Sequence, residues 1–290
     1  MNAAGILGFG HEYRGLLDPT HLAAFVTNPL TYKPRTPANG PNAAPLAEGL
    51  LIHTGLPNPG VRQAVRRWDK EWGRLGVPVI VHLAVTTPAE TVHSLDLLER
   101  AQGIAAIELG LRDDVTDFEA GQLVRAALGG PPLLARLPLT RAVELAAVVV
   151  QAGADALTVA APPRHETHID GQPARGRLYG PGGLAQALAA VRAVAALNLG
   201  RPIIGAGGIY SVEAAQAMLA AGAVAVQIDA AIWTRPQIIE DMREHGKGDP
   251  ENARPGTEYA YLSRIIVTGP SLLISTNMCA PKRPVCTGTP

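Results

Sequence analysis

The feature of this sequence that most constrains its fold is a regular alternation of short apolar runs with Ala-rich segments of helical period. Residues 201–233 show one complete unit, in which an apolar run is followed by a Gly-Gly turn, a helical segment and the next apolar run. Parallel strands joined by crossover helices produce this order. We expect eight strands, at residues 4–8, 23–27, 77–85, 105–111, 132–139, 156–161, 202–206 and 223–229. Eight such units close a barrel, so the sequence predicts an α/β fold of the (β/α)8 TIM-barrel class.

Length and composition indicate one domain. With 290 residues, of which 47% are hydrophobic and 17% charged, the chain buries a large core, and barrels of this size form a single domain. We expect the TIM-barrel domain to cover residues 1–262. Residues 263–290 lose the alternation and are predicted to form a poorly ordered, Pro-containing tail, in which Cys279 and Cys286 are reduced surface thiols.

The charge balance narrows the range of partners. Lys plus Arg and Asp plus Glu both number 25, so the chain has no overall field to attract a polyanion or an anionic membrane. No apolar run reaches the roughly 18 residues of a membrane span. We therefore expect a soluble, cytoplasmic protein with a small-molecule substrate and no nucleic-acid or membrane partner.

Two long segments interrupt the alternation, at residues 28–60 and 162–183. Both are rich in Pro and Gly and follow the carboxyl end of a strand, where barrel enzymes hold their chemistry. We expect both to be functional loops on the same rim of the barrel.

The Gly-Gly turn is a candidate anion site. Gly207 and Gly208 follow a strand and let the backbone approach a ligand before Ser211 caps the next helix. Their N–H groups favour a phosphate, and the next strand ends at Asp229 beside them. A tight strand-to-helix turn needs the same glycines, so the motif alone leaves that alternative open.

These residues introduce a family resemblance that covers about residues 3–240. The Gly-Gly stretch resembles the flavin-phosphate end of dihydroorotate dehydrogenases, which are FMN-linked barrels of pyrimidine biosynthesis that oxidise dihydroorotate to orotate. The segments AAGILGFGHEY, TYKPRTPANGPNAAPLAEGLLIHTGLPNPGV, AAIELGL, PLLARLPL and GRLYGPGGLAQALAAVRAV follow in the family's order. The resemblance implies FMN as cofactor, a homodimer and an electron-transfer partner subunit. The FMN-binding residues that it implies are Ala4, Gly180, Gly207, Gly208, Asp229 and Ala230.

Several positions depart from the family's pattern at the substrate. Gly55 and Leu56 of the family's substrate loop remain, and His82 stands where the family has an Asn; these three are the implied substrate-binding residues. The family's Lys after the second strand and its other amide positions are replaced by Asn28, Ile52, Gly110 and Ala161. The resemblance therefore implies a substrate that has diverged from dihydroorotate.

The catalytic positions also depart from the family. The family's Cys or Ser base should fall near Asp113 and Asp114, and Asp113 is the candidate base if burial raises its pKa. The same stretch also fits a solvated loop with Asp117 as a helix N-cap. Arg136 replaces the family's strand-five Lys and keeps its positive charge near the flavin, where it needs a ligand or an Asp partner.

The phosphate end departs as well, because Asp229-Ala230 replaces the family's Gly-Thr. A carboxylate beside a phosphate dianion repels it unless the side chain points away.

Three further groups of residues have competing interpretations. His165 and His168, with Glu166 and Asp170, fit either a metal site or a mixed polar loop, and we expect no metal. His82 either donates to a ligand or bonds to the backbone. The pair of tryptophans in RRWDKEW, Trp68 and Trp72, is expected to pack its helix against a neighbouring helix.

The leading hypothesis is an FMN-dependent dehydrogenase acting on a CH–CH group, with Asp113 and Arg136 as catalytic residues. Two alternatives remain open. One is a barrel that has lost redox catalysis and acts as a structural or regulatory subunit. The other is a non-flavin barrel enzyme that acts on a phosphorylated metabolite.

Overall fold

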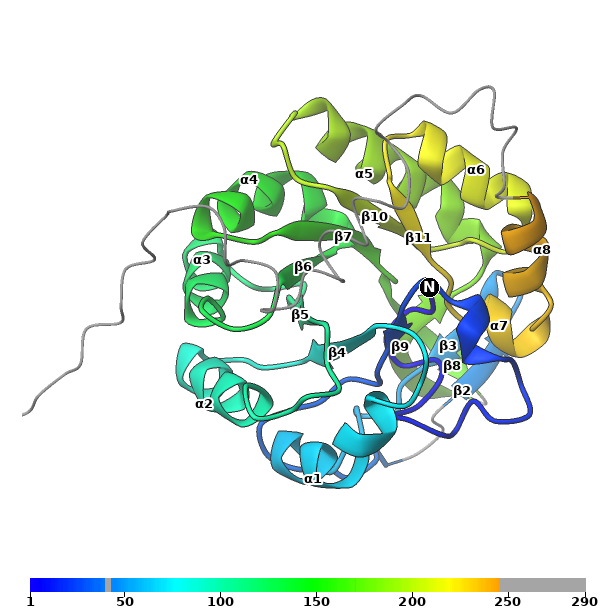
Figure 1. Ribbon diagram of the computed structural model, residues 1–290. Helices are drawn as coiled ribbons and strands as arrows, with labels where there is room; N and C mark the ends of the chain where they lie inside the picture. Colours follow the sequence, from blue (N-terminus) through cyan, green and yellow to red (C-terminus); the bar gives the residue numbers. More distant parts are fainter. Residues whose placement is uncertain (40–42, 170, 246–290) are drawn as a thin grey trace, which may run out of the picture.

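The computed structural model of the chain describes residues 1–39, 43–169 and 171–245 (Figure 1). The predicted tail, its two cysteines, Asp170 and the expected domain boundary at residue 262 lie outside the described residues.

A parallel sheet forms the centre of the fold, with helices around its outside (Figure 1). The order is β1-β4-β5-β6-β7-β10-β11, and every neighbouring pair is parallel. The strands are β1 (Phe25–Val26), β4 (Val79–Leu83), β5 (Ala106–Gly110), β6 (Leu133–Pro138), β7 (Ala156–Ala161), β10 (Ile203–Ala206) and β11 (Ala225–Gln227). They fall within seven of the predicted strand ranges. The predicted TIM-barrel class is confirmed.

Several of the helices that return between the strands begin at side-chain caps. Thr87 caps α2, and Ser211 caps α6 as predicted. The cap of α3 is Thr116, which exchanges hydrogen bonds with Glu119 in a capping box, so the predicted cap Asp117 is instead the first helical residue. The helices are α1 (Val61–Trp72), α2 (Pro88–Leu98), α3 (Asp117–Ala126), α4 (Ala142–Ala152), α5 (Leu184–Ala196), α6 (Val212–Ala220), α7 (Ala231–Thr234) and α8 (Ile238–His245).

The N-terminal segment closes the barrel between β11 and β1. Asn2 forms a parallel bridge with Ile228, and Ala3 N–H donates to the Ile228 carbonyl at 2.7 Å. On the other side the Asn2 amide replaces a strand backbone: its Nδ2 donates to the Val26 carbonyl at 2.7 Å, and its Oδ1 accepts from Val26 N–H at 3.0 Å. One side chain thus supplies the pairing with Val26, and Asn28 N–H, which donates to the Gly8 carbonyl at 2.8 Å, adds a second link.

The predicted first strand at residues 4–8 is wrong, because the chain pairs two residues earlier. Residues 4–8 turn instead, with Gly5 and Gly8 at φ of 90° and 84°. Those angles belong to the left-handed region, which glycine adopts at little cost and a strand does not use. The apolar residues that suggested a strand are nevertheless buried in the core.

The tryptophans of α1 hold the segment after this turn in place. The Trp68 ring stacks on Phe9 with centroids 4.9 Å apart, and Trp72 Nε1 donates to the Phe9 carbonyl at 2.6 Å. Both rings also belong to the buried cluster that contains Leu95 and Leu98 of α2, so the expected packing of α1 against a neighbouring helix stays a prediction.

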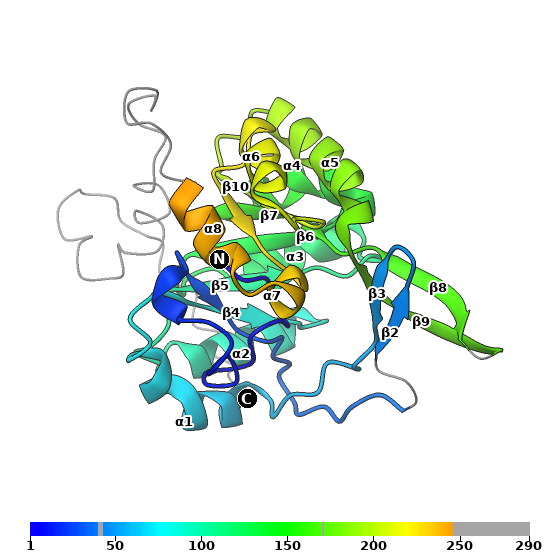
Figure 2. The same ribbon diagram turned by 90° about the vertical axis from the view of Figure 1, so that its right-hand side faces the viewer.

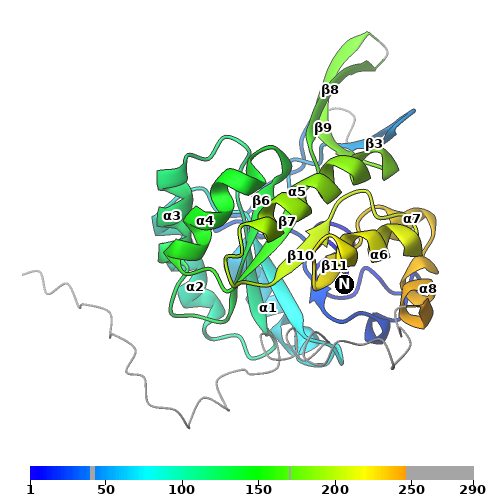
Figure 3. The ribbon, with the colours of Figure 1, turned by 90° about the horizontal axis from the view of Figure 1, so that it is seen from above.

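The two long segments form a second, antiparallel sheet that extends from one end of the barrel (Figures 2 and 3). Its order is β2-β3-β9-β8, with β2 (Ala43–Leu46) and β3 (Gly49–Ile52) from the first segment and β8 (Arg164–Ile169) and β9 (Gln172–Tyr179) from the second. The expected loops thus contain strands. Their predicted place on one rim is confirmed, since β3 pairs with β9.

The two segments approach so closely that a side chain would not fit between them. A Cβ atom on Gly49 would lie 2.1 Å from the Tyr179 carbonyl oxygen, and one on Gly180 would lie 2.1 Å from the Glu48 carbonyl oxygen. The two segments can therefore come into contact because both positions are glycine.

The barrel interior has an apolar floor. Inward-facing residues of successive strands form one buried cluster, which contains Val26, Ile80, Ala106, Leu134, Ala156 and Ile204. Because strand side chains alternate with period two, the residue two positions later on each strand also faces inward, closer to the carboxyl end. In the described part of the chain, no helix is both long and apolar enough to cross a membrane.

Asn2→Ala tests the closure. We expect the variant to lower the free energy of unfolding by about 1–3 kcal/mol for each buried Val26 backbone group left unpaired. Urea unfolding followed by circular dichroism measures the change. The matched control is Asn39→Ala, at an exposed Asn, which should leave stability within about 0.5 kcal/mol of the parent. Equal stability of the two variants would show that the Asn2 amide does not close the ring.

Candidate functional site

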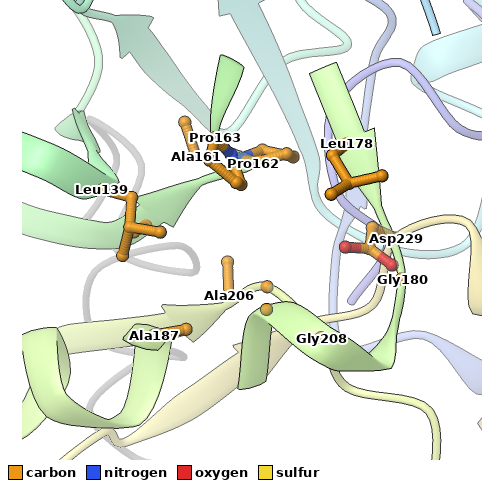
Figure 4. A pocket seen from close by; sticks show the side chains of 13 residues that line it. Leu139, Ala161, Pro162, Pro163, Leu178, Gly180, Ala187, Ala206, Gly208 and Asp229 are labelled. Atoms are coloured by element: carbon orange, nitrogen blue, oxygen red, sulfur yellow. The ribbon is translucent and has the colours of Figure 1, made fainter. Parts of the chain in front are cut away.

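A small pocket opens at the carboxyl ends of β7, β10 and β11, beneath the antiparallel sheet (Figure 4). Its volume is about 10 Å³, close to the space that one water molecule requires. The lining residues are Leu139, Ala160, Ala161, Pro162, Pro163, Leu178, Gly180, Gly183, Ala187, Ala206, Gly207, Gly208 and Asp229. A larger depression of about 360 Å³ lies around Pro202 and Gly222, at the opposite end of the strands. Barrel chemistry occurs at the carboxyl ends, so the smaller pocket marks the candidate site.

A layer of polar side chains lies below this mouth, two residues beyond the apolar floor on each strand. Its members come from five strands: His82, Glu108, Arg136, Thr158 and Gln227. All are buried. Buried polar groups persist only when they are hydrogen-bonded to one another or to the backbone.

Glu108 is the centre of this layer. Its Oε1 accepts from Thr158 Oγ1 at 2.7 Å and from Gln227 Nε2 at 2.6 Å. Its Oε2 lies 2.6 Å from His82 Nδ1 and 3.6 Å from Arg136 Nη1. The carboxylate thus ties β4, β6, β7 and β11 to β5.

The electrostatics of the layer keep Glu108 ionised. Burial alone would raise the pKa of this carboxyl, but the hydrogen bond from His82 and the charge of Arg136 outweigh burial and lower the pKa to about 2. Arg136 also donates from Nη1 to Gln227 Oε1 at 3.1 Å. The carboxylate partner of Arg136 is therefore Glu108 rather than the expected Asp, and a ligand partner stays a prediction.

His82 presents its second ring nitrogen towards the mouth. Nδ1 faces Glu108, and a Cβ atom on Gly110 would lie 2.6 Å from Nε2. Gly110 follows Glu108 by two residues on the same inward face, so its missing side chain leaves the space that the imidazole fills. A neutral ring that donates Nδ1–H to a carboxylate has Nε2 as its basic nitrogen.

The two glycines of the Gly-Gly turn have different neighbours. A Cβ atom on Gly208 would lie 2.3 Å from the backbone nitrogen of Leu184, so this glycine permits α5 to pack against the turn. A Cβ atom on Gly207 would face the pocket wall, 3.4 Å from the Ala187 Cβ atom. The φ angles are 101° at Gly207 and 72° at Gly208, and both suit glycine.

Asp229 lies at the side of the pocket and is 3% exposed. Burial raises the pKa of its carboxyl to about 6, against the lowering effects of the Arg136 charge and of hydrogen bonds from the backbone N–H groups of Ala231, Gly208 and Ala230. Its Oδ1 is buried and accepts no hydrogen bond from the described residues. Figure 4 shows one carboxylate oxygen directed into the pocket.

Asp113 lies in a different environment from the one that a base requires. Arg177 binds both of its oxygens, at 2.8 and 2.6 Å, and Arg164 Nε donates to Oδ2 at 2.8 Å. Burial raises the pKa of Asp113, but these arginines outweigh burial and lower it. The raised pKa expected for a base is absent, and the carboxylate instead joins the loop after β5 to the β8–β9 hairpin.

The other predicted binding residues lie in three places. Gly180, Gly207, Gly208 and Asp229 line one pocket, and Ala230 follows Asp229 directly. Ala4 packs with the apolar floor of the barrel. Gly55 and Leu56 lie in a turn with φ of 75° and 56°, and a Cβ atom on Gly55 would lie 2.7 Å from Ala38 N.

The described members of the alternative metal site, His165, Glu166 and His168, do not converge on one point. His165 and His168 are three residues apart in β8, so they face opposite sides of the strand. Glu166 pairs instead with Arg175 at 3.1 Å. Within the described ranges, no group of three or more His, Cys, Asp or Glu residues is arranged to hold a metal ion.

Sequence reasoning missed Glu108, Thr158 and Gln227. Each is a polar residue within an apolar strand, two positions beyond a floor residue on the inward face. A polar residue at an inward-facing position of an apolar strand is the signal that could have identified them, as it identified Arg136.

Comparisons with known proteins agree with this fold. Residues 1–245 match the family described as "Dihydroorotate dehydrogenase". A protein of Desulforudis audaxviator named "Dihydroorotate dehydrogenase B (NAD(+)), catalytic subunit" is 33% identical over 265 residues, which cover 81% of this chain and 83% of that protein. A protein of the same name from Endomicrobium trichonymphae is 30% identical, with 81% and 83% covered. The chain belongs to the dihydroorotate dehydrogenase family.

A solved structure supports the fold. The crystal structure of DHODH from Eimeria tenella in complex with ferulenol superposes with a TM-score of 0.70, covering 84% of this chain and 79% of that chain. Its sequence identity is 16%, so the likeness concerns the fold.

FMN, which the resemblance implies, fits this site poorly at its phosphate end. The backbone N–H groups of Gly208, Ala230 and Ala231 would suit a phosphate, but they already bond the Asp229 carboxylate. A phosphate dianion placed there would lie against a buried negative charge. The phosphate end is therefore the part of FMN that the described residues fit least.

Glu108→Gln tests the polar layer. A depressed carboxyl pKa adds stability above the ordinary value of 4.5, and that stability is lost as pH falls towards 2. We expect the variant to lose about 3 kcal/mol of unfolding free energy at pH 7, because Arg136 loses its buried partner. The variant should also lose much of the parent's pH dependence between pH 4.5 and 2. Urea unfolding across pH measures both effects.

The control for this variant is Glu166→Gln, at an exposed ion pair that contributes about 0–1 kcal/mol. If Glu108→Gln were as stable as this control at pH 7, Glu108 would not hold the layer together.

Proposed function

We propose that this chain is an oxidoreductase of the dihydroorotate dehydrogenase type, which removes a proton and a hydride from a CH–CH bond of a small molecule. The observation that carries the proposal is the His82–Glu108–Arg136 cluster at the mouth of a barrel whose family match extends from residue 1 to residue 245. A candidate base and a cation just below the mouth, where barrel enzymes react substrates, support this proposal.

In this proposal His82 Nε2 accepts the substrate proton. Glu108 orients the imidazole by accepting from Nδ1 and stabilises the imidazolium that forms, since the carboxylate lies 2.6 Å away. Arg136 contributes a fixed positive charge that favours negative charge developing at the mouth. Asp113, the base expected from the sequence, is bound by two arginines and is the weaker candidate.

We also propose that the substrate has diverged from dihydroorotate. The positions where the resemblance implies Asn side chains hold Ile52, His82, Gly110 and Ala161. Each polar group of the substrate left without a partner costs about 1–3 kcal/mol. The hydrophobic Ala161 and Pro162 in the pocket wall favour a less polar substrate.

The cofactor and partners complete the proposal. A flavin is the hydride acceptor that the resemblance implies. The relatives' names describe them as catalytic subunits, which supports an electron-transfer partner for this chain. A homodimer and the expected cytoplasmic location remain part of the proposal.

The absorption spectrum tests the oxidoreductase proposal. We expect the purified protein to carry or take up a flavin and to bleach at the flavin's visible band when dihydroorotate is added without oxygen. The kcat/KM for dihydroorotate should lie at least about 100-fold below that of the Desulforudis audaxviator relative, because two or more lost hydrogen bonds weaken the transition state. A protein that takes up no flavin would contradict flavin-linked oxidation, and an equal kcat/KM would contradict a diverged substrate.

His82→Gln tests the base. Gln keeps a polar group beside Glu108 but cannot accept the proton, so we expect kcat to fall by about 10²–10⁴-fold while flavin affinity stays unchanged. Stopped-flow bleaching measures the rate, with His168→Gln on the exposed β8 strand as control. Retention of the parental rate by His82→Gln would exclude His82 as the base.

A further inference from the structure

The turns that follow β10 and β11 form an anion-binding site, the anion seat, which faces the carboxyl group of Asp229 from the same chain. The backbone N–H groups of Gly208, Ala230 and Ala231 lie close enough to the carboxyl group of Asp229 to lower its pKa. Converging backbone N–H groups of this kind bind anions in many proteins. Here they face a carboxylate of the same chain.

The same carboxyl group also faces the pocket. Asp229 is 3% exposed, its Oδ1 accepts no hydrogen bond from the described residues, and one of its oxygens points into the cavity (Figure 4). Asp229 has the only polar side chain in the described lining, since the remaining lining residues are Gly, Ala, Pro and Leu. A buried acceptor without a donor carries a free-energy penalty that a ligand donor would remove.

The charge on Asp229 is not neutralised by its surroundings. Arg136 is the cation that influences it, and that guanidinium is already bonded to Gln227 and paired with Glu108 at 3.6 Å. Burial raises the pKa of Asp229 to about 6. A second anion in this seat would lie against this carboxylate in a desolvated place, where like charges repel strongly.

We propose that Asp229 fills the anion seat with its own carboxylate, so that this pocket rejects a phosphate group and instead accepts an uncharged hydrogen-bond donor, such as a ligand hydroxyl. The small cavity admits only the end of such a ligand. The inference extends the proposed function, because it assigns to a flavin-binding barrel a preference for the phosphate-free form of the flavin.

The experiment compares FMN with riboflavin, which share their ring and ribityl chain and differ in the terminal phosphate. Titrations followed by flavin fluorescence use the parent, Asp229→Asn and Asp229→Gly. Asn keeps the size of the side chain and removes the charge, whereas Gly removes both. Asp114→Asn is the control, because it removes one negative charge from a side chain that is 75% exposed.

We expect the parent and Asp114→Asn to bind riboflavin at least as tightly as FMN. In Asp229→Asn and Asp229→Gly the ratio of FMN to riboflavin affinity should rise by about tenfold or more, as expected for removing one close charge repulsion. A parent that prefers FMN, with a ratio unchanged in both Asp229 variants, would overturn the proposal.

A second measurement does not depend on flavin use. Inorganic phosphate should raise the Tm of Asp229→Gly, whose seat is open, and leave the Tm of the parent unchanged. If no variant binds either flavin, the proposed oxidoreductase function fails, and the phosphate measurement alone decides the role of Asp229. Equal phosphate effects on the parent and on Asp229→Gly, including no effect on either, would then overturn the inference.

Discussion

The buried carboxylate of Glu108 is the interaction on which the barrel mouth depends. An ionised group without solvent is costly, and this one is retained because side chains from four other strands donate to it or neutralise it. The same contacts fix the rotamers of His82 and Arg136, the two groups best placed for chemistry. Stability and function therefore rest on one set of contacts at this level of the barrel.

The regular part of the fold could be predicted from the sequence because its signals are local. The strand at β7 has the predicted bounds, and the helices follow from their period and caps. The antiparallel sheet has no such signal: β3 pairs with β9, more than a hundred residues away, and the glycines that allow this contact look like loop residues. The first strand was misplaced because a single side chain, Asn2, performs half of its pairing.

The candidate site was predictable in its position and not in its arrangement. Gly180, Gly207, Gly208 and Asp229 do meet in one pocket, as the strand ends indicate. Sequence could not show that the Leu184 backbone packs against Gly208, or that the Asp229 carboxylate turns into the N–H groups beside it. The first fact, and the Gly208 part of the second, depend on contacts between turns that are distant in the chain.

The antiparallel sheet above the mouth has a consequence for the kinetics of ligand exchange. Leu178 lines the pocket and is also a residue of β9, which is hydrogen-bonded to β3 on one side and β8 on the other. On this side the cavity is therefore bounded by a hydrogen-bonded sheet, and widening it there involves β9 together with its neighbouring strands. Collective motions of this kind occur in microseconds to milliseconds, which is the range in which we expect ligand exchange past this wall.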